Sequence, residues 1–348
     1  MLPPFKIGDN MKAGALFSGI GGFCLGFEPE GLPTEWAVEK DAYAHRTYRE
    51  NVTGAKVLLA DIRDVTVTKH KLAPVDVLHA GFPCQSFSQA GRRAGFEDER
   101  GRLFFEIMRL VKEFGAEKPK VLVFENSPYL RSGDGGAWFL TLQNAIRRAG
   151  YWFQDENAEE LNAATLTALP QQRNRLFMVA LSMDHFSSGR MTFPTPMASL
   201  SKDLSTFIDF ENDVDDYYYL PKDNRYYDMI KQSEIGKRQI YQLRKYLVRA
   251  KDEGVCPTLT ANMGQGGHNV PFVFAPSGLR KLTEYECLAL QGFPKSFLFP
   301  DDVPKAKRYT QIGNAVAVPV ANRVAKTVKM LLDKRQALNE QSRIHISN

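Results

Sequence analysis

Short apolar runs alternate with segments of helical periodicity through the first half of the chain. These runs predict a helix over about 103–114 and strands at residues 13–17, 35–39, 57–60, 75–80, 121–125 and 175–181. Strands that alternate with helices are typical of βαβ units. The pattern therefore predicts an α/β fold built on a parallel sheet.

The pattern changes after residue 181, where Ser, Pro, Asp and Tyr become frequent, and we place a boundary near 184–196. Helical periodicity returns at the S/T-x-x-E spacing of Thr283 and Glu286, a capping box that opens a helix through about residue 290. Residues 318–338 predict a long amphipathic helix. The expected units are a larger domain of 11–183 and 309–340, a smaller, irregular domain of 190–276, and a hinge with a connecting helix over 277–308.

A chain of 348 residues with 43% hydrophobic content can bury a full core. We expect no membrane span, because no apolar run reaches about eighteen residues, and no secretory signal, because the first residues lack an apolar stretch. The four cysteines are scattered without CxxC pairing, which argues against zinc or disulfides and indicates a cytoplasmic protein without a metal. We interpret Cys24 and Cys287 as small buried hydrophobic residues.

The net charge of +5 is distributed unevenly along the chain. Residues 221–251 hold nine Lys or Arg against three Asp or Glu, with several tyrosines among them. Such a segment indicates a polyanionic partner, although a basic run is more often only a solvated helix face.

A glycine-rich turn, FSGIGG at residues 17–22, follows the first predicted strand. Glycines allow a sharp turn and close approach of a ligand. Glu39, at the end of the next strand, could accept hydrogen bonds from ribose hydroxyls, and Asp61 could contact an adenine amine. Because Cys24 stands where the dinucleotide pattern G-x-G-x-x-G needs glycine, a nucleoside without phosphates, such as S-adenosylmethionine, fits better. A turn without any ligand is the alternative.

Two reactive side chains follow neighbouring predicted strands. Cys84 comes after the strand at 75–80, and Glu125 ends the strand at 121–125. Ligands of open parallel sheets sit beyond the carboxyl ends of the strands, so we expect both side chains in one cleft with the glycine turn. Pro83 removes a backbone donor and fixes φ directly before the thiol.

A catalytic thiol needs help to ionise, since an ordinary one, with a pKa of about 8.5, is mostly protonated at neutral pH. Arg173 and Arg175, in the segment QQRNR, are plausible sources of the necessary positive potential. A polar turn before a strand is an equally good interpretation of that segment taken alone.

Six blocks now carry a family resemblance, in order from about residue 16 to 325: PCQSFS, GFEDERGRLFFEIMRLV, FEN, QQRNR, RKLTEYECLALQGFP and QIGNAVAVPVANRVA. Together with the opening FSGIGG, they resemble the bacterial C5-cytosine DNA methyltransferases. The resemblance implies a Rossmann-like domain that uses S-adenosylmethionine and a smaller, irregular target-recognition domain. It also implies methyl transfer to C5 of a flipped cytosine in a specific double-stranded DNA sequence.

The resemblance implies a role for each site residue. Cys84 would attack C6 of cytosine, Glu125 would contact N3 and the exocyclic amine, and Arg175 with Arg173 would hold the base and support the thiolate. Because C5 is a poor nucleophile, a covalent adduct at C6 divides one difficult step into two easier ones. Residues implied to contact S-adenosylmethionine are Phe17, Gly19, Gly21, Gly22, Glu39, Asp61, Ile62, Pro83, Leu103 and Asn314.

The target base is inaccessible within a duplex and must be flipped out. We therefore expect the glycine- and arginine-rich segment 85–102 to form a mobile loop that closes over the DNA. Its Gln85 and Ser88 would lie near the vacated space. Candidate DNA-binding residues are Gln85, Ser88, Arg92, Arg93, Arg225, Arg238, Arg244, Thr258, Gly266 and Gly267.

The chain departs from the family pattern at two places. Ser127 stands where the family usually has the valine of the tripeptide ENV, and Ala60 stands where a glycine is usual before Asp61. The alternatives are a tRNA cytosine-5 methyltransferase on the same fold and a catalytically silent DNA-binding protein. We expect a monomer with a partner restriction endonuclease that acts on the same site.

Overall fold

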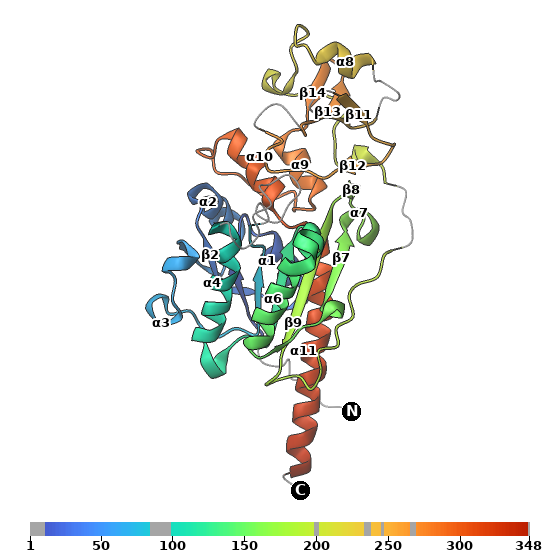
Figure 1. Ribbon diagram of the computed structural model, residues 1–348. Coiled ribbons are helices and arrows are strands. Elements are labelled where there is room, and N and C mark those ends of the chain that lie inside the picture. The colour runs from blue at the N-terminus through green and yellow to red at the C-terminus, as the bar shows by residue number, and fades with distance from the viewer. Residues whose placement is uncertain are drawn as a thin grey trace, which may run out of the picture.

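An eight-stranded sheet forms the centre of the larger part of the molecule (Figure 1). The computed structural model describes residues 11–83, 99–197, 202–232, 238–244, 247–264 and 269–346. The strand order is β3-β2-β1-β4-β5-β9-β6, with β7 also paired to β9. The strands are β1 (Ala13–Leu16), β2 (Thr34–Glu39), β3 (Lys56–Leu59), β4 (Val77–Ala80), β5 (Val121–Asn126), β6 (Tyr151–Trp152), β7 (Ala158–Asn162) and β9 (Asn174–Ser182).

The six predicted strands are all present, and the first five pair in parallel as expected. β9 differs, because it runs antiparallel to β5 and carries β6 and β7 with it. The sheet is therefore mixed, with an antiparallel edge. This reversal brings the beginning of β9 to the carboxyl end of β5.

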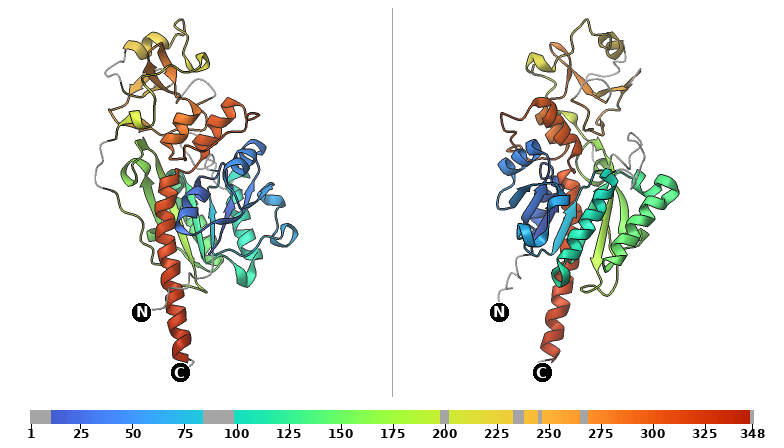
Figure 2. Two further views of the ribbon diagram at one scale, coloured as in Figure 1. Left: turned by 180° about the vertical axis from the view of Figure 1, so that it is seen from behind. Right: turned by 60° about the vertical axis from the view of Figure 1, so that its left-hand side comes forward.

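Helices cover both faces of this sheet. Leu122 and Phe124 of β5 face a core shared with α4 and α6, while Val121 and Val123 face a core shared with α1 and α11. Figure 2 shows α11 lying along the back of the sheet and extending beyond it. The helices are α1 (Gly22–Phe27), α2 (Ala42–Asn51), α3 (Val67–His70), α4 (Glu99–Glu113), α5 (Tyr129–Ser132), α6 (Ala137–Arg148), α7 (Ala163–Leu166) and α11 (Val318–Ile346). A strand that is apolar on both faces requires this three-layer arrangement.

The smaller part contains a four-stranded antiparallel sheet of order β11-β10-β13-β14, more regular than its sequence indicated. Its own core includes Ile230, Tyr241, Leu243, Phe272 and Leu279. β14 belongs to this sheet although it lies beyond residue 276. The elements are α8 (Tyr227–Gln232), β10 (Tyr241–Arg244), β11 (Leu247–Ala250), β13 (Pro271–Ala275) and β14 (Gly278–Lys281).

Two helices and a short strand pair join the parts (Figures 1 and 2). The helices are α9 (Glu284–Leu290) and α10 (Lys305–Asn314), and β8 (Gln171–Gln172) pairs with β12 (Cys256–Pro257). The predicted capping box is confirmed, because Thr283 and Glu286 exchange side-chain-to-backbone hydrogen bonds. No helix within the described ranges is both long and apolar enough to cross a bilayer.

Candidate active site

The carboxyl ends of β1, β4 and β5 meet at one edge of the sheet. Leu16 and Phe124 both lie beside Ala80 in the strand register, one on each side. The buried Asn126 amide then donates to the Phe82 carbonyl at 3.1 Å, two residues before Cys84. The chain that leads to the predicted nucleophile is thereby tied to the end of β5. Asn126 was not among the predicted site residues, although an amide next to a strand-end acid was the available signal.

Glu125 and Arg175 form an ion pair at this edge. Their register follows from the antiparallel pairing, in which Glu125 lies opposite Phe177. Arg175 Nε lies 3.0 Å from Glu125 Oε1, and the two side chains are 22% and 11% exposed. Among the described residues, Oε1 accepts no aligned hydrogen bond although it is buried. The contact between this oxygen and Arg175 is therefore an ion pair without an aligned hydrogen bond.

The same carboxylate lies next to the strand end that leads to Cys84. A Cβ atom built on Gly81 would stand 3.7 Å from Glu125 Oε2. A small cavity is lined by Glu125, Arg173, Arg175 and Val316, among others. The acid and both predicted arginines thus border one space, as the strand order required.

Arg173 makes different contacts from Arg175. It is buried and donates to the carbonyls of Leu259 at 2.9 Å, Gly313 at 3.0 Å and Ala315 at 2.9 Å. These carbonyls belong to the segment after β12, to the last turn of α10 and to the loop before α11. Arg173 therefore braces the joint between the two parts, beside the ion pair of Arg175.

Several predicted site residues fall outside the described part of the chain. Among the catalytic and loop residues these are Cys84, Gln85, Ser88, Arg92 and Arg93, and in the recognition segment Gly266 and Gly267. The same holds for the side chain of Arg244, whose backbone lies in β10, and for residues 85–98 of the predicted closing loop.

The predicted cofactor turn has the backbone that glycine permits. Gly19 and Gly21 have φ angles of +55° and +92°, and Phe17 adopts +53°. A Cβ on Gly22 would lie 2.3 Å from the Val316 carbonyl oxygen, so only glycine fits there. By contrast, no heavy atom lies within 4 Å of a Cβ position on Gly19. The turn is open on the side where a ligand would approach.

Glu39 ends β2 directly beneath this turn. One carboxylate oxygen accepts from the Gly19 amide at 2.7 Å, and the other accepts from the amides of Lys40 and Asp41, each at 2.8 Å. Burial raises the pKa of the Glu39 carboxyl above its usual value. The acid therefore fixes the turn and is itself fixed by three backbone donors.

Asp61 follows β3 and is held by two cations. Its carboxylate pairs with Arg63 at 2.7 Å and with Lys40 at 2.6 Å. The hydrogen bonds from Arg63, followed by those from Lys40, hold the pKa of Asp61 well below its usual range. Asp61 is ionised and could accept a hydrogen bond from an amine.

The other predicted cofactor residues surround the same strand ends. Ile62 is buried, Leu103 on α4 and Pro83 are half-buried, and Asn314 is exposed at the end of α10. Two residues after Asn314, Val316 packs its carbonyl against Gly22. This set of one half-buried acid, one ionised acid, apolar walls and an open glycine turn fits an adenosyl group and offers no phosphate cradle among the described residues.

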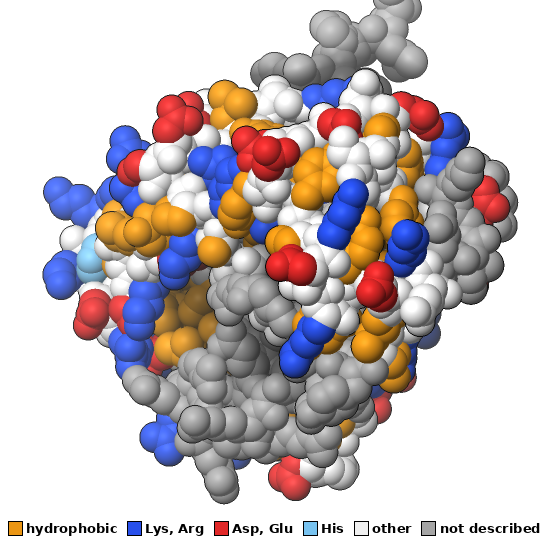
Figure 3. All heavy atoms as spheres, turned by 90° about the horizontal axis from the view of Figure 1, so that it is seen from above, with side chains coloured by type: hydrophobic (Ala, Val, Ile, Leu, Met, Phe, Trp, Pro, Cys, Tyr) orange, Lys and Arg blue, Asp and Glu red, His pale blue; other side chains and the backbone are white. Residues whose placement is uncertain are grey.

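The described DNA-binding candidates are dispersed over the smaller part. Arg225 stacks on Tyr226 at 4.5 Å, Arg238 pairs with Glu211 at 2.8 Å, and Thr258 donates to the Gln172 carbonyl at 2.6 Å. On the face seen in Figure 3, basic side chains are interspersed with acidic and apolar ones. The described residues of this face do not form a single basic patch.

The interpretation of Cys24 and Cys287 as buried residues is confirmed, since both thiols are free and buried. Burial raises the pKa of each. Neither thiol is ionised at neutral pH, and neither has the access that a nucleophile needs. Among the described residues, no three His, Cys, Asp or Glu side chains form a group that could hold a metal ion.

Comparison with known proteins gives consistent matches over the whole fold. The family model described as C-5 cytosine-specific DNA methylase matches residues 11–330. The Type II methyltransferase M.Bsp6I of Bacillus sp. (strain RFL6) is 39% identical over 322 residues, which cover 91% of this chain and 98% of that protein. The Type II methyltransferase M.HaeII of Haemophilus aegyptius is 33% identical, with 89% and 90% covered.

Solved structures agree in fold. The Spodoptera frugiperda DNMT2 mutant has a TM-score of 0.68 at 19% identity, and it covers 91% of this chain and 99% of its own. The Entamoeba histolytica methyltransferase EhMeth has a TM-score of 0.66 at 17% identity, covering 94% and 99%. At these identities the likeness concerns the fold alone.

Proposed function

Because the chain belongs to the C-5 cytosine-specific DNA methylase family and is a DNA (cytosine-5-)-methyltransferase, we propose that Cys84, Glu125 and Arg175 form its catalytic centre. The observation that carries this proposal is the Glu125–Arg175 ion pair at the carboxyl end of β5, beside the strand end that leads to Cys84. A carboxylate is costly to bury unless a cation compensates it, and Arg175 supplies that cation here.

In this mechanism Cys84 bonds through sulfur to C6 of a flipped cytosine, and the displaced electron pair makes C5 nucleophilic. Glu125 contacts N3 and the exocyclic amine and stabilises the charge that develops on the ring. Arg175 holds the acid in place and raises the positive potential around the thiolate. The displaced electron pair forms the bond from C5 to the methyl group; C5 then loses its proton, the S–C6 bond breaks and the thiolate is regenerated.

S-adenosylmethionine is the methyl donor that the site fits, and it supplies an electrophilic methyl group when bound. The open turn at Phe17, Gly19, Gly21 and Gly22 would receive it. Glu39 would accept hydrogen bonds from ribose hydroxyls and Asp61 from the adenine amine. The adenosyl group would also contact Ile62, Pro83, Leu103 and Asn314.

We assign sequence recognition to the domain of residues 190–276 together with β14, which completes its sheet. The remaining units are the catalytic domain of residues 11–183 and 309–340 and the hinge region of residues 277–308. The relatives named Type II methyltransferases support a role in restriction and modification, with a partner endonuclease that cleaves the same sequence. We propose a monomer that resides in the cytoplasm, on the nucleoid when bound to DNA.

Replacing each of two cysteines with alanine tests the catalytic centre. Cys84→Ala should abolish methyl transfer to DNA while S-adenosylmethionine binding, measured by calorimetry, survives. Cys24→Ala is the control and should keep activity, because its thiol is buried behind the turn. Equal loss of activity in both variants would contradict the assignment.

Sequencing of methylated cytosines in DNA from cells that express the chain would identify the recognised site. Methyl transfer to tRNA instead of DNA would overturn the DNA assignment.

A further inference from the structure

Two lysines and two tyrosines gather where the small sheet meets α10. Lys281, the last residue of β14, places its ammonium 3.7 Å from the ring centre of Tyr217. Lys305, the first residue of α10, lies 4.3 Å from the ring centres of both Tyr217 and Tyr218. Two ammonium groups therefore share one aromatic platform.

The two lysines differ in how their charges are balanced. Lys305 donates to the Tyr218 hydroxyl at 3.1 Å, and that hydroxyl donates to the buried Glu284 carboxylate at 2.5 Å. Within the described ranges, the Lys281 ammonium contacts the rings of Tyr217, Tyr218 and Tyr309 and forms no ion pair or hydrogen bond. The cluster thus carries one uncompensated positive charge, half-buried beside an exposed aromatic ring, which favours an anion.

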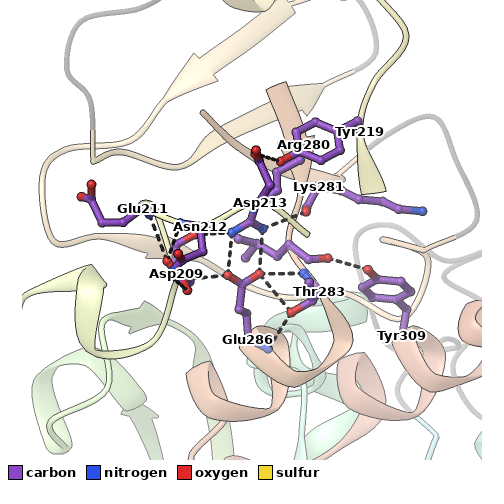
Figure 4. A network of polar contacts seen from close by, with 11 residues as sticks. Asp209, Glu211, Asn212, Asp213, Tyr219, Arg280, Lys281, Thr283, Glu286 and Tyr309 are labelled. Carbon is purple, nitrogen blue, oxygen red and sulfur yellow. Dashed lines mark hydrogen bonds and ion pairs between the residues drawn. The ribbon is translucent and has the colours of Figure 1, made fainter. Parts of the chain in front are cut away.

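The position of the cluster indicates which anion it would meet. Lys281 and Tyr217 line one cavity with Met263 and Gly264. Gly264 packs on Tyr309 of α10 and comes two residues before Gly266, which with Gly267 is a candidate DNA-binding residue. In Figure 4 the Lys281 side chain extends away from the Arg280–Glu286 pair and above Tyr309. The Lys281 ammonium therefore lies in the same cavity as the residue that leads into the candidate DNA-binding glycines.

A purely structural role explains the cluster less well. A tyrosine that only filled the small core would be buried, whereas Tyr217 is 46% exposed. Two like charges around one ring also repel each other, a cost that an anion between them would remove.

We propose that Lys281 and Lys305, on the Tyr217 and Tyr218 platform, bind one backbone phosphate of the DNA at the hinge side of the recognised sequence. Ammonium groups act as point charges toward phosphate, and the contact carries no sequence information. It fixes the register of the duplex against α10, whose other end carries Asn314 of the proposed cofactor site. The inference rests on DNA being the substrate.

The test is the salt dependence of DNA binding by the full chain. Affinity for one synthetic duplex is measured by fluorescence anisotropy over a salt series for the wild type, Lys281→Gln and Lys305→Gln. Loss of one phosphate contact should reduce the slope of log K against log salt by about 0.9. Each variant should raise KM for DNA severalfold and leave S-adenosylmethionine binding unchanged.

Two further variants separate this contact from a structural effect. Lys281→Arg should restore the slope, and Lys329→Gln, on α11 behind the large sheet, should not alter it. The inference would be overturned if the Lys281→Gln and Lys305→Gln proteins folded and still methylated DNA but kept the wild-type slope. An enzyme that failed to methylate any DNA would instead overturn the function on which the inference rests.

Discussion

At the scale of single residues, burial decides which titratable groups take part in chemistry. His79 lies in the middle of β4, fully buried, with its ring 4.9 Å from Phe23 and 5.0 Å from Phe27. Burial lowers its pKa to about 3, so the imidazole is neutral and packs as an aromatic ring. Glu125, by contrast, stands at the end of the neighbouring strand with a cation beside it. Two adjacent strands thus carry one structural and one reactive group.

Replacing His79 should change how stability depends on pH. Because its pKa is lower in the folded state, the unfolded chain binds the extra proton, and stability present above pH 6.5 is lost as the pH falls toward 3. Between pH 7 and pH 5 this group should lower the free energy of unfolding by up to about 2 kcal/mol. His79→Phe lacks this contribution, so its free energy of unfolding, measured with urea, should fall less between pH 7 and pH 5 than that of the wild type. An identical pH difference in both proteins would contradict the burial argument.

At the scale of elements, the start of α9 shows how a local signal becomes a tertiary joint. Glu286 caps its own helix and also accepts from the buried guanidinium of Arg280 at 2.8 and 2.9 Å. It further accepts from the Asp209 amide at 3.0 Å (Figure 4). One carboxylate therefore fixes the helix, β14 and the preceding segment. The sequence spacing predicted the cap but not the ion pair.

Removing Arg280 should destabilise this joint. Arg280→Met leaves the Glu286 carboxylate buried without its cation, a change that costs about 3–5 kcal/mol. Arg238→Met is a matched control, because its ion pair with Glu211 is exposed and contributes at most about 1 kcal/mol. Thermal and urea unfolding of both variants measure the difference. Equal, small losses would mean that the buried pair contributes little to stability.

At the scale of the whole molecule, the two parts are held together by backbone contacts as well as by apolar packing. β8 pairs with β12, and Arg173 spans from the segment after β12 to the loop before α11. That loop also packs on the cofactor turn through Val316 and Gly22. The recognition domain and the proposed cofactor site are therefore joined through one buried guanidinium.

Arg173 and Arg175, two residues apart, should respond differently to replacement by Met. Arg173→Met leaves three carbonyls without their charged donor and should lower the free energy of unfolding by more than about 3 kcal/mol. Arg175→Met leaves the buried Glu125 carboxylate without its cation and should also cost stability, but less than Arg173→Met because the Arg175 side chain is partly exposed, and it should lower kcat strongly. Unfolding curves and single-turnover kinetics distinguish the two effects. A stable but inactive Arg173→Met protein would make Arg173 catalytic instead of structural.

The sequence by itself determined six strands of the large sheet, the cap of α9, the glycine turn and the family, because these depend on periodicity, local backbone chemistry and the order of motifs. β1 to β5 and α9 lie close to where the pattern placed them. Only the tertiary structure decided that β9 runs antiparallel, which brings Arg175 to Glu125. It also decided that Arg173 braces the two domains and that Lys281 and Lys305 share one aromatic platform. These relations join residues far apart in the chain, and their partners depend on which strand ends and helix faces meet, which a one-dimensional pattern of polarity does not encode.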